Sequence, residues 1–123
     1  MLPTITVIGE RGRWDEMGPG IWSTGKATQT INACARSPTL NLSWVRHVKD
    51  RLRERGLIMG DALHVLKLGF VLENPQPATR PGYFKYVIEA TTPNSGGRTV
   101  AVVVIPDGAC DLKMITVMWK DEL

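Results

Sequence analysis

The fold is decided by the stretch YFKYVIEATTPNSGGRTVAVVVIPDGACDLKMITVMW, which covers residues 83–119. Its first part alternates between apolar and polar side chains, a pattern typical of a strand with one buried face, and its middle part is a continuous apolar run, as in a central strand covered on both faces. Three strands are expected here, at residues 83–92, 99–105 and 112–119, and residues 70–74 before them are a candidate fourth, so the sheet is expected to have three or four strands. Two turn sequences separate them, Asn94-Ser95-Gly96-Gly97 and Asp107-Gly108. The sequence therefore predicts an antiparallel β-meander.

Two helices are expected before this meander. Residues 40–44 alternate like a short strand or the lead-in to a helix. Between Trp44 and Arg55 the apolar residues recur at three- and four-residue spacing, and Gly56 is placed to end the helix. Residues 59–68 form a second apolar pattern that ends at Gly69. Two short helices joined by a few residues predict a helical hairpin. Helices followed by an antiparallel meander are an α+β layout, with the helices packed on one face of the sheet.

The domain organisation follows from where this pattern begins. Residues 40–120 are expected to form one α+β domain and residues 121–123 a tail. Residues 1–39 read as an N-terminal extension that is partly ordered, with a β-like run at residues 4–8. Its later part has two alternatives, which are a strand or short helix (around Ala27 to Ala35) laid on the main domain, or a loose arm.

Composition narrows the class of protein. The chain has 123 residues, of which 43% are hydrophobic and 22% charged, values typical of a globular domain with one core. Its two cysteines, Cys34 and Cys110, belong to no CxxC or Cys/His cluster, so two free thiols are expected rather than a disulfide or a metal site. No cofactor is expected. The chain has no apolar run long enough for a signal peptide or a membrane helix, which favours a cytoplasmic protein.

The basic residues gather in one segment. The formal net charge is +3, and residues 46–55 contain five basic against two acidic side chains, so this segment accounts for the whole excess. Within it, His47, Arg51 and Arg55 stand four residues apart and form one stripe along the predicted helix. Guanidinium groups at this spacing can bridge successive phosphates, and a histidine can move a proton near neutral pH. A solvated helix face with local ion pairs is the alternative.

A second group of candidates lies on or beside the first strand of the meander: Arg80, Lys85 and Tyr86. Basic and aromatic side chains interleaved on a sheet can hold RNA by charge and by stacking. Cross-strand packing and protection of a sheet edge are the alternative. Strand alternation also places Lys85 and Tyr86 on opposite faces, which argues against their acting together.

The segment HVKDRLRERGL, residues 47–57, is followed by a second helix, by Tyr83-Phe84-Lys85-Tyr86 and by the closing strand Ile115-Thr116-Val117-Met118-Trp119. This order resembles a bacterial domain family of unknown activity. The signature of that family is a helix reading H-x-x-x-R-(M/L)-x-x-R-G-(I/L), a short helix and a meander that ends in I-(I/T)-V-x-(Y/W). The family is similar in architecture to the RelE/BrnT-type toxins of bacterial toxin–antitoxin pairs, which are small RNA-cleaving α+β proteins.

The resemblance implies an RNA-binding protein or a metal-independent ribonuclease of the toxin–antitoxin type. In such a nuclease an RNA 2′-hydroxyl attacks the adjacent phosphate, which requires a base, an acid and cations for the developing charge. His47 or Lys85 would move protons as catalytic residues. The nucleic-acid-binding residues would be Arg51, Arg55, Arg80 and Tyr86. The expected partners are RNA or the ribosome, together with a small antitoxin-like protein.

One departure from the RelE-like pattern lies at the end of the chain. RelE-like toxins usually place basic or aromatic catalytic residues there, whereas this chain has Asp121 and Glu122. The competing hypothesis is a non-catalytic module that binds protein or RNA, in which the three stripe residues brace the fold. Convergence of the stripe on an open concave surface would favour the nuclease. Its engagement by backbone carbonyls and acidic groups would favour the non-catalytic module.

Overall fold

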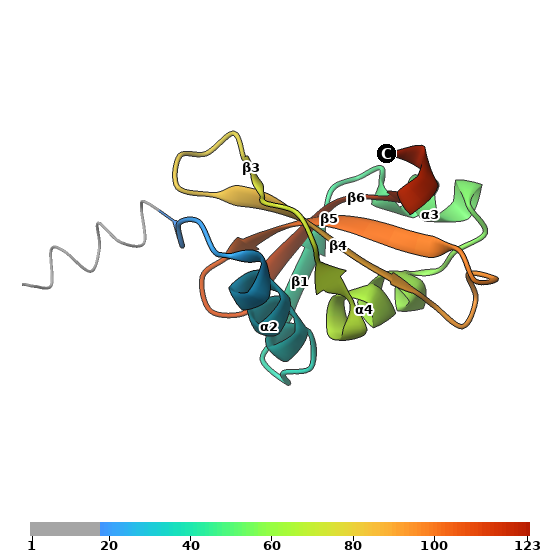
Figure 1. The fold of residues 1–123 in the computed structure, drawn as a ribbon, viewed down its shortest axis with the longest axis horizontal. Helices are drawn as coiled ribbons and strands as arrows, with labels where there is room; N and C mark the ends of the chain where they lie inside the picture. The colour runs from blue at the N-terminus through green and yellow to red at the C-terminus, as the bar shows by residue number, and fades with distance from the viewer. Residues whose placement is uncertain (1–17) are drawn as a thin grey trace, which may run out of the picture.

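A computed structural model of the chain describes residues 18–123 (Figure 1). These residues contain three α-helices and six strands, with a 3-10 helix after the last strand. The elements are α2 (Thr24–Ala35), β1 (Asn41–Trp44), α3 (Val48–Glu54), α4 (Met59–Leu68), β2 (Phe70–Val71), β3 (Gln76–Pro77), β4 (Phe84–Thr91), β5 (Thr99–Asp107), β6 (Asp111–Trp119) and η1 (Lys120–Glu122). The α+β class is confirmed, whereas the strand expected at residues 4–8 lies outside the described part of the chain. No helix within residues 18–123 has the length and apolar character needed to span a membrane.

The strands form one mixed sheet in the order β1-β6-β5-β4-β2, with β3 also paired with β4. The long strands β4, β5 and β6 pair antiparallel, which confirms the predicted meander. In contrast, β1 runs parallel to β6, with Leu42 opposite Leu112, so the expectation of a purely antiparallel sheet is wrong. Parallel strands need a long crossover connection. Here the chain between β1 and β6 passes through α3, α4 and the other four strands.

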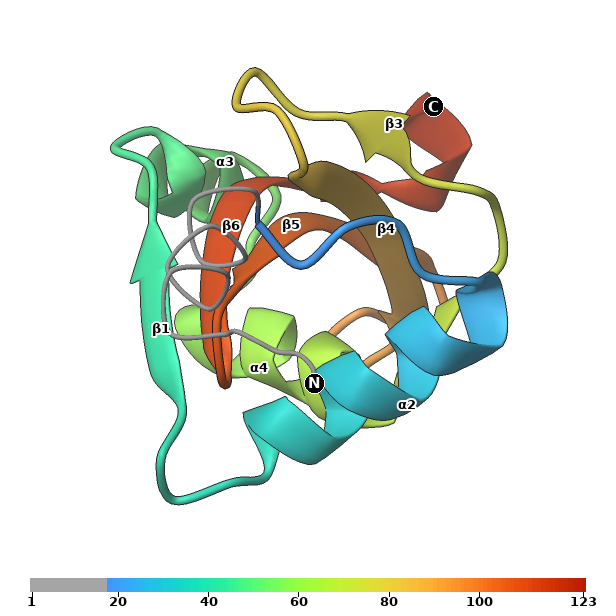
Figure 2. The same cartoon turned by 90° about the vertical axis from the view of Figure 1, so that its left-hand side faces the viewer.

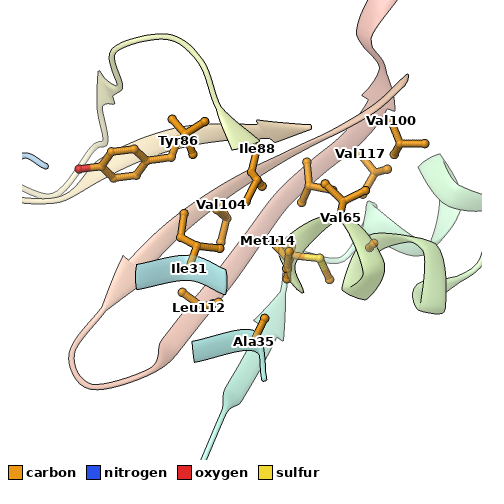
Figure 3. Close-up of a cluster of buried hydrophobic side chains, with 14 of the residues drawn as sticks. Ile31, Ala35, Val65, Tyr86, Ile88, Val100, Val104, Leu112, Met114 and Val117 are labelled. Atoms are coloured by element: carbon orange, nitrogen blue, oxygen red, sulfur yellow. The ribbon is translucent and has the colours of Figure 1, made fainter. Parts of the chain in front are cut away.

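The hydrophobic core lies between the sheet and the helices. Figure 2 shows the sheet curving over α4, with α2 beside it. In Figure 3, Ile31 of α2 and Val65 of α4 point toward side chains of the three long strands. Tyr86 and Ile88 of β4 are 1% and 0% exposed. Lys85, whose side chain lies on the opposite face of the same strand, is partly exposed. The predicted alternation of β4 is therefore confirmed, and it directs Lys85 away from the core.

The helix partner of α4 is α2. As predicted, α4 begins at Met59 and is followed by Gly69, and it packs against α2, β4 and β5. The amide of Asn32 in α2 donates to the carbonyl of Leu66 at 2.7 Å, which fastens the two helices together. The expected hairpin of two neighbouring helices is therefore wrong, because the first of them packs elsewhere.

That first helix, α3, begins later than expected and packs against β6. The sequence predicts a helix from Trp44, but residues 41–44 are held in β1 by pairing with β6. The backbone N–H of Val45 still donates to a β6 carbonyl at 3.0 Å, so the helix can start only at Val48. Its end is as predicted, since Gly56 follows it with a φ of 68°, in the left-handed region that glycine favours.

The helix α2 lies within the expected extension and yet contributes to the core. Ala27 and Ile31 are fully buried. The hydroxyl of Thr28 accepts a 2.8 Å hydrogen bond from the backbone N–H of Val71, on the side of β2 that faces away from β4. Of the two alternatives for residues 27–35, the structure thus shows the helix laid on the domain.

A disulfide joins the end of α2 to the turn between β5 and β6. Its cysteines are Cys34 and Cys110, whose Cα atoms lie 4.8 Å apart. The expectation of two free thiols is therefore wrong. Because the two cysteines lie 76 positions apart in the sequence, no local spacing motif signals the pair, and only the packing of α2 on the sheet brings them together.

Candidate nucleic-acid interface

The three residues of the predicted basic stripe lie at the start, middle and end of α3 and make different contacts. His47 is the N-cap residue, and its exposed side chain makes no capping hydrogen bond. Arg51 pairs with Glu54 through a contact of 3.3 Å, and both side chains are about half exposed. Arg55 is the C-cap residue and is only 16% exposed at its side chain. The stripe therefore does not converge on one concave surface.

Arg55 is engaged by the C-terminal end of the described chain. Its Nε and Nη2 donate to the two carboxylate oxygens of Glu122 at 2.8 Å each, and its Nη1 donates to the carbonyl of Arg51 at 3.2 Å. The hydrogen bond to Glu122 raises the pKa of Arg55. Hydrogen bonds from Arg55 and from the Trp119 backbone lower the pKa of Glu122 to about 2. Engagement by a carboxylate and a carbonyl favours a bracing role for Arg55 in this state.

This pair predicts a pH-dependent contribution to stability. The pKa of Glu122 falls from its ordinary 4.5 to about 2 on folding, so its ionised form stabilises the fold above pH 4.5. The contribution is lost as the pH falls from 4.5 through about 2. We expect the Glu122→Gln variant to lose less stability than wild type over this window, measured as urea midpoints at about pH 6, 4 and 2.5. Equal losses in both proteins would contradict the assignment.

Tyr86 is a core residue and offers no ring face to a nucleobase. It is 1% exposed, and its ring stacks on Trp22 with centroids 5.6 Å apart. Its hydroxyl accepts a 2.8 Å hydrogen bond from the backbone N–H of Trp22. Burial raises the pKa of this hydroxyl. We therefore leave Tyr86 out of the interface.

Lys85 and His47, the two expected catalytic residues, are not brought to a common site. Lys85 lies on β4, and β5 and β6 separate this strand from β1, the strand that leads to His47. Three strand spacings of about 4.8 Å amount to about 14 Å along the sheet. A general acid and a general base must both reach one phosphodiester. The structure therefore gives no support to a catalytic pair made of these two side chains.

An exposed aromatic and basic corner forms where β1 leads into α3. We call the residues Trp44, Arg46, His47 and Lys49 the β1–α3 corner. Trp44 is 39% exposed, and the Lys49 ammonium lies 5.6 Å from its ring centroid. Neither Arg46 nor Lys49 forms an ion pair with any residue in the range 18–123. Sequence reasoning missed Trp44, because it counted this residue as the first turn of a helix.

A cavity of about 390 Å³, lined by polar and apolar side chains alike, lies on the other side of β1. The Arg80 guanidinium covers the Tyr83 ring at 4.1 Å from its centroid and lies 3.8 Å from the Asp107 carboxylate. The Tyr83 hydroxyl donates to the same carboxylate at 3.0 Å. The cavity also contains Asp111 and Lys113. Two cations and two carboxylates make the cavity nearly neutral, so Arg80 belongs to a mixed-charge site rather than to a basic patch.

The cavity and the corner share strand β1. Asn41 and Ser43 line the cavity, and strand alternation directs Leu42 and Trp44 to the opposite face. Neither surface has a metal-ligating character: within residues 18–123 no three His, Cys, Asp or Glu side chains are grouped so that they could hold a metal ion. The corner therefore carries the uncompensated positive charge, and the cavity carries hydrogen-bonding groups.

Residues 44–119 match a family model described as a domain of unknown function (DUF4258). The chain belongs to the DUF4258 family. No curated protein and no solved structure matches the chain. The similarity of this DUF4258 protein to RelE/BrnT-type toxins therefore stays a prediction.

Some of the residues that make the contacts described above lie inside the span matched by the DUF4258 model, and others lie outside it. The β1–α3 corner lies inside it, whereas α2 and η1 lie outside. Arg55 is thus part of the DUF4258 domain, but its carboxylate partner Glu122 follows the matched span. The ion pair that engages Arg55 is consequently made between the family domain and a segment beyond it.

Proposed function

We propose that this DUF4258 protein binds single-stranded RNA at the β1–α3 corner without cleaving it. The observation that carries the proposal is the exposed Trp44 ring with the Lys49 ammonium above it, next to Arg46, which forms no ion pair with residues 18–123. Nucleobases of unpaired RNA stack on exposed aromatic rings, and neighbouring cations hold the phosphates. The corner offers both kinds of contact within six consecutive residues.

Electrostatics supports the corner over the rest of α3. Arg53 pairs with Asp50 at 3.1 Å and Arg51 with Glu54 at 3.3 Å, so their charges are locally compensated. Arg46 and Lys49 have no such partner among the described residues. A polyanion can therefore bind these two cations without first displacing a carboxylate.

Binding without cleavage is the version of the proposal that the geometry supports best. Cleavage through the RNA 2′-hydroxyl needs one group to take a proton and another to give one. His47 is the only residue of the corner with a side chain suited to that task near neutral pH. Lys85, the other candidate, lies on β4 and outside the cavity beside the corner.

Fluorescence anisotropy with a labelled RNA of about 12 nucleotides tests the proposal. We expect Trp44→Ala to weaken binding about tenfold, since stacking of one base contributes about 1–3 kcal/mol. Lys49→Glu should weaken binding and flatten its dependence on salt, because one phosphate contact is lost. Lys67→Glu is the matched control: this exposed lysine of α4 undergoes the same charge change away from the corner.

Two results would decide against the proposal. Equal loss of affinity in Lys49→Glu and Lys67→Glu would show that binding follows net charge and not the corner. Shortening of the RNA during incubation, abolished by His47→Ala, would show a nuclease in place of a binding module. Circular dichroism of each variant confirms that the fold is retained.

A further inference from the structure

Three consecutive residues after β6 each pair with a different element. Lys120 bonds Glu89 of β4 at 2.6 Å, Asp121 bonds Arg98 at 2.8 Å and Glu122 bonds Arg55 at 2.8 Å. We call Lys120, Asp121 and Glu122 the C-terminal clasp. The clasp engages two arginines of the DUF4258 domain, Arg55, which caps the end of α3, and Arg98, which directly precedes β5.

The two arginines are arranged as an anion-binding site. Two nitrogens of Arg55 donate hydrogen bonds to the Glu122 carboxylate. In the same way, Arg98 donates to the Asp121 carboxylate through Nε at 3.3 Å and Nη2 at 2.8 Å. The Arg98 guanidinium also lies 4.0 Å from the Trp119 ring centroid. A guanidinium that makes this two-pronged contact with a carboxylate makes the same contact with a phosphate.

We propose that Arg55 and Arg98 form a phosphate-binding site for RNA, which Asp121 and Glu122 occupy while no RNA is bound. The inference rests on the proposed RNA binding at the β1–α3 corner and adds a second contact region to it. The two acidic side chains act as an intramolecular substitute for two phosphates. RNA that reaches the site replaces them.

Opening the clasp leaves the hydrophobic core undisturbed. None of the residues of η1 is buried. The side chains of Asp121, Arg98 and Glu122 are 66%, 49% and 38% exposed, so a solvated ligand has access to them. The Arg98–Asp121 ion pair is exposed on both sides, so it contributes little to stability and is screened by salt. The Arg55–Glu122 pair is more protected, since the Arg55 side chain is only 16% exposed. A polyanion held nearby therefore competes first for Arg98.

The site lies at the opposite end of α3 from the corner. Lys49 and Arg55 lie six residues apart on the same helix and its cap, which corresponds to about 9 Å along the axis at a rise of about 1.5 Å per residue. Arg55, Arg98 and Trp119 lie inside the DUF4258 span, whereas Asp121 and Glu122 lie outside it. The clasp thus covers a basic and aromatic surface of the family domain with residues that follow that domain.

A double-mutant cycle tests the clasp with the same labelled RNA. The four proteins are the wild type, Arg98→Ala, the charge-neutral pair Asp121→Asn with Glu122→Gln, and the combination of all three changes. We expect the neutralised clasp to bind RNA about three- to tenfold more tightly than wild type. In the wild-type background, Arg98→Ala should change the affinity for RNA little, because the Asp121 carboxylate already occupies Arg98. In the background with the neutralised clasp, Arg98→Ala should remove most of the gain in affinity.

A single-charge control separates the clasp from long-range electrostatics. Glu73 is exposed and acts on Lys120 only through its charge, so Glu73→Gln removes one negative charge near the clasp without freeing an arginine. Glu122→Gln should tighten RNA binding more than Glu73→Gln. Thermal unfolding of both variants verifies the fold.

The outcomes are distinguishable from those of the proposed function. Equal effects of Arg98→Ala in both backgrounds, or equal gains from Glu73→Gln and Glu122→Gln, would overturn the clasp proposal and leave binding at the corner intact. No RNA binding by any of the four proteins would overturn both.

Discussion

Replacing Cys34 and Cys110 together by serine is expected to lower the free energy of unfolding by about 3–4 kcal/mol. The disulfide closes a loop across 76 residues of sequence, and the loss of chain freedom in the unfolded state sets an upper value of about 4.5 kcal/mol for such a loop. The midpoint of thermal unfolding should fall by about 10 °C. Circular dichroism at 222 nm, recorded during heating, measures this shift.

The wild-type protein in a reducing buffer is the control for the serine variant. Reduction removes the same covalent bond but leaves thiols where the variant has hydroxyls, so the midpoint of the reduced protein should fall in the same direction and by a similar amount. An unchanged wild-type midpoint on reduction, together with two titratable thiols in the native protein, would contradict the assignment of the disulfide.

The disulfide also bears on the expected cytoplasmic location. Disulfides persist in oxidising compartments and are rare where thiols are kept reduced. In a reducing cytoplasm we expect the chain to carry two thiols and to have the lower stability of the serine variant. Alkylation of thiols at the moment of lysis, followed by measurement of the intact mass, shows which form the cell contains.

Replacing Asp61 by alanine is the second large change, with an expected loss of about 2–4 kcal/mol. Asp61 is 5% exposed and accepts hydrogen bonds from the Ile58 backbone at 2.8 Å, from the Thr92 hydroxyl at 2.7 Å and from the Asn94 amide at 3.1 Å. Burial alone would raise its pKa, but these hydrogen bonds lower it overall. Alanine leaves the Thr92 hydroxyl and the Ile58 N–H without their acceptor in a buried place.

A matched control for this change is Asp50→Ala. Asp50 is also in the first turn of a helix, but its side chain is 58% exposed and, among the described residues 18–123, forms an ion pair only with Arg53. We expect this variant to lose less than about 1 kcal/mol, since exposed ion pairs contribute little. Urea unfolding of the two variants side by side measures the difference. Similar losses would show that the Asp61 hydrogen bonds do not join α4 to the β4–β5 turn as described.

The elements that sequence reasoning placed correctly are those with strong local signals. The meander follows from the alternation of residues 83–92 and from the Asn94-Ser95-Gly96-Gly97 turn, because both signals lie within the elements they specify. The helix α4 was placed for the same reason, since Gly69 marks its end directly. Local chemistry is sufficient for such elements.

The features that sequence reasoning missed depend on residues far apart in the chain. β1 has only four residues, and its pairing with β6 brings together positions such as Leu42 and Leu112, so no local pattern distinguishes it from the start of a helix. This one error displaced the start of α3 and concealed the exposure of Trp44. Arg55 was found by its spacing, but its partner Glu122 lies 67 residues away. Several residues of the site were therefore predicted from the sequence, but the contacts that these residues make were not.

The hydrogen bond from Val71 to the Thr28 hydroxyl has a consequence for any fragment of this protein. Strands at the border of a sheet expose backbone groups that can template pairing with another chain. By accepting the outward N–H of β2, α2 closes that border. A fragment limited to residues 44–119 would lack α2 and would expose both this border and the apolar side chains that α2 covers. We expect such a fragment to self-associate, and size-exclusion chromatography of the fragment beside the full chain would measure this.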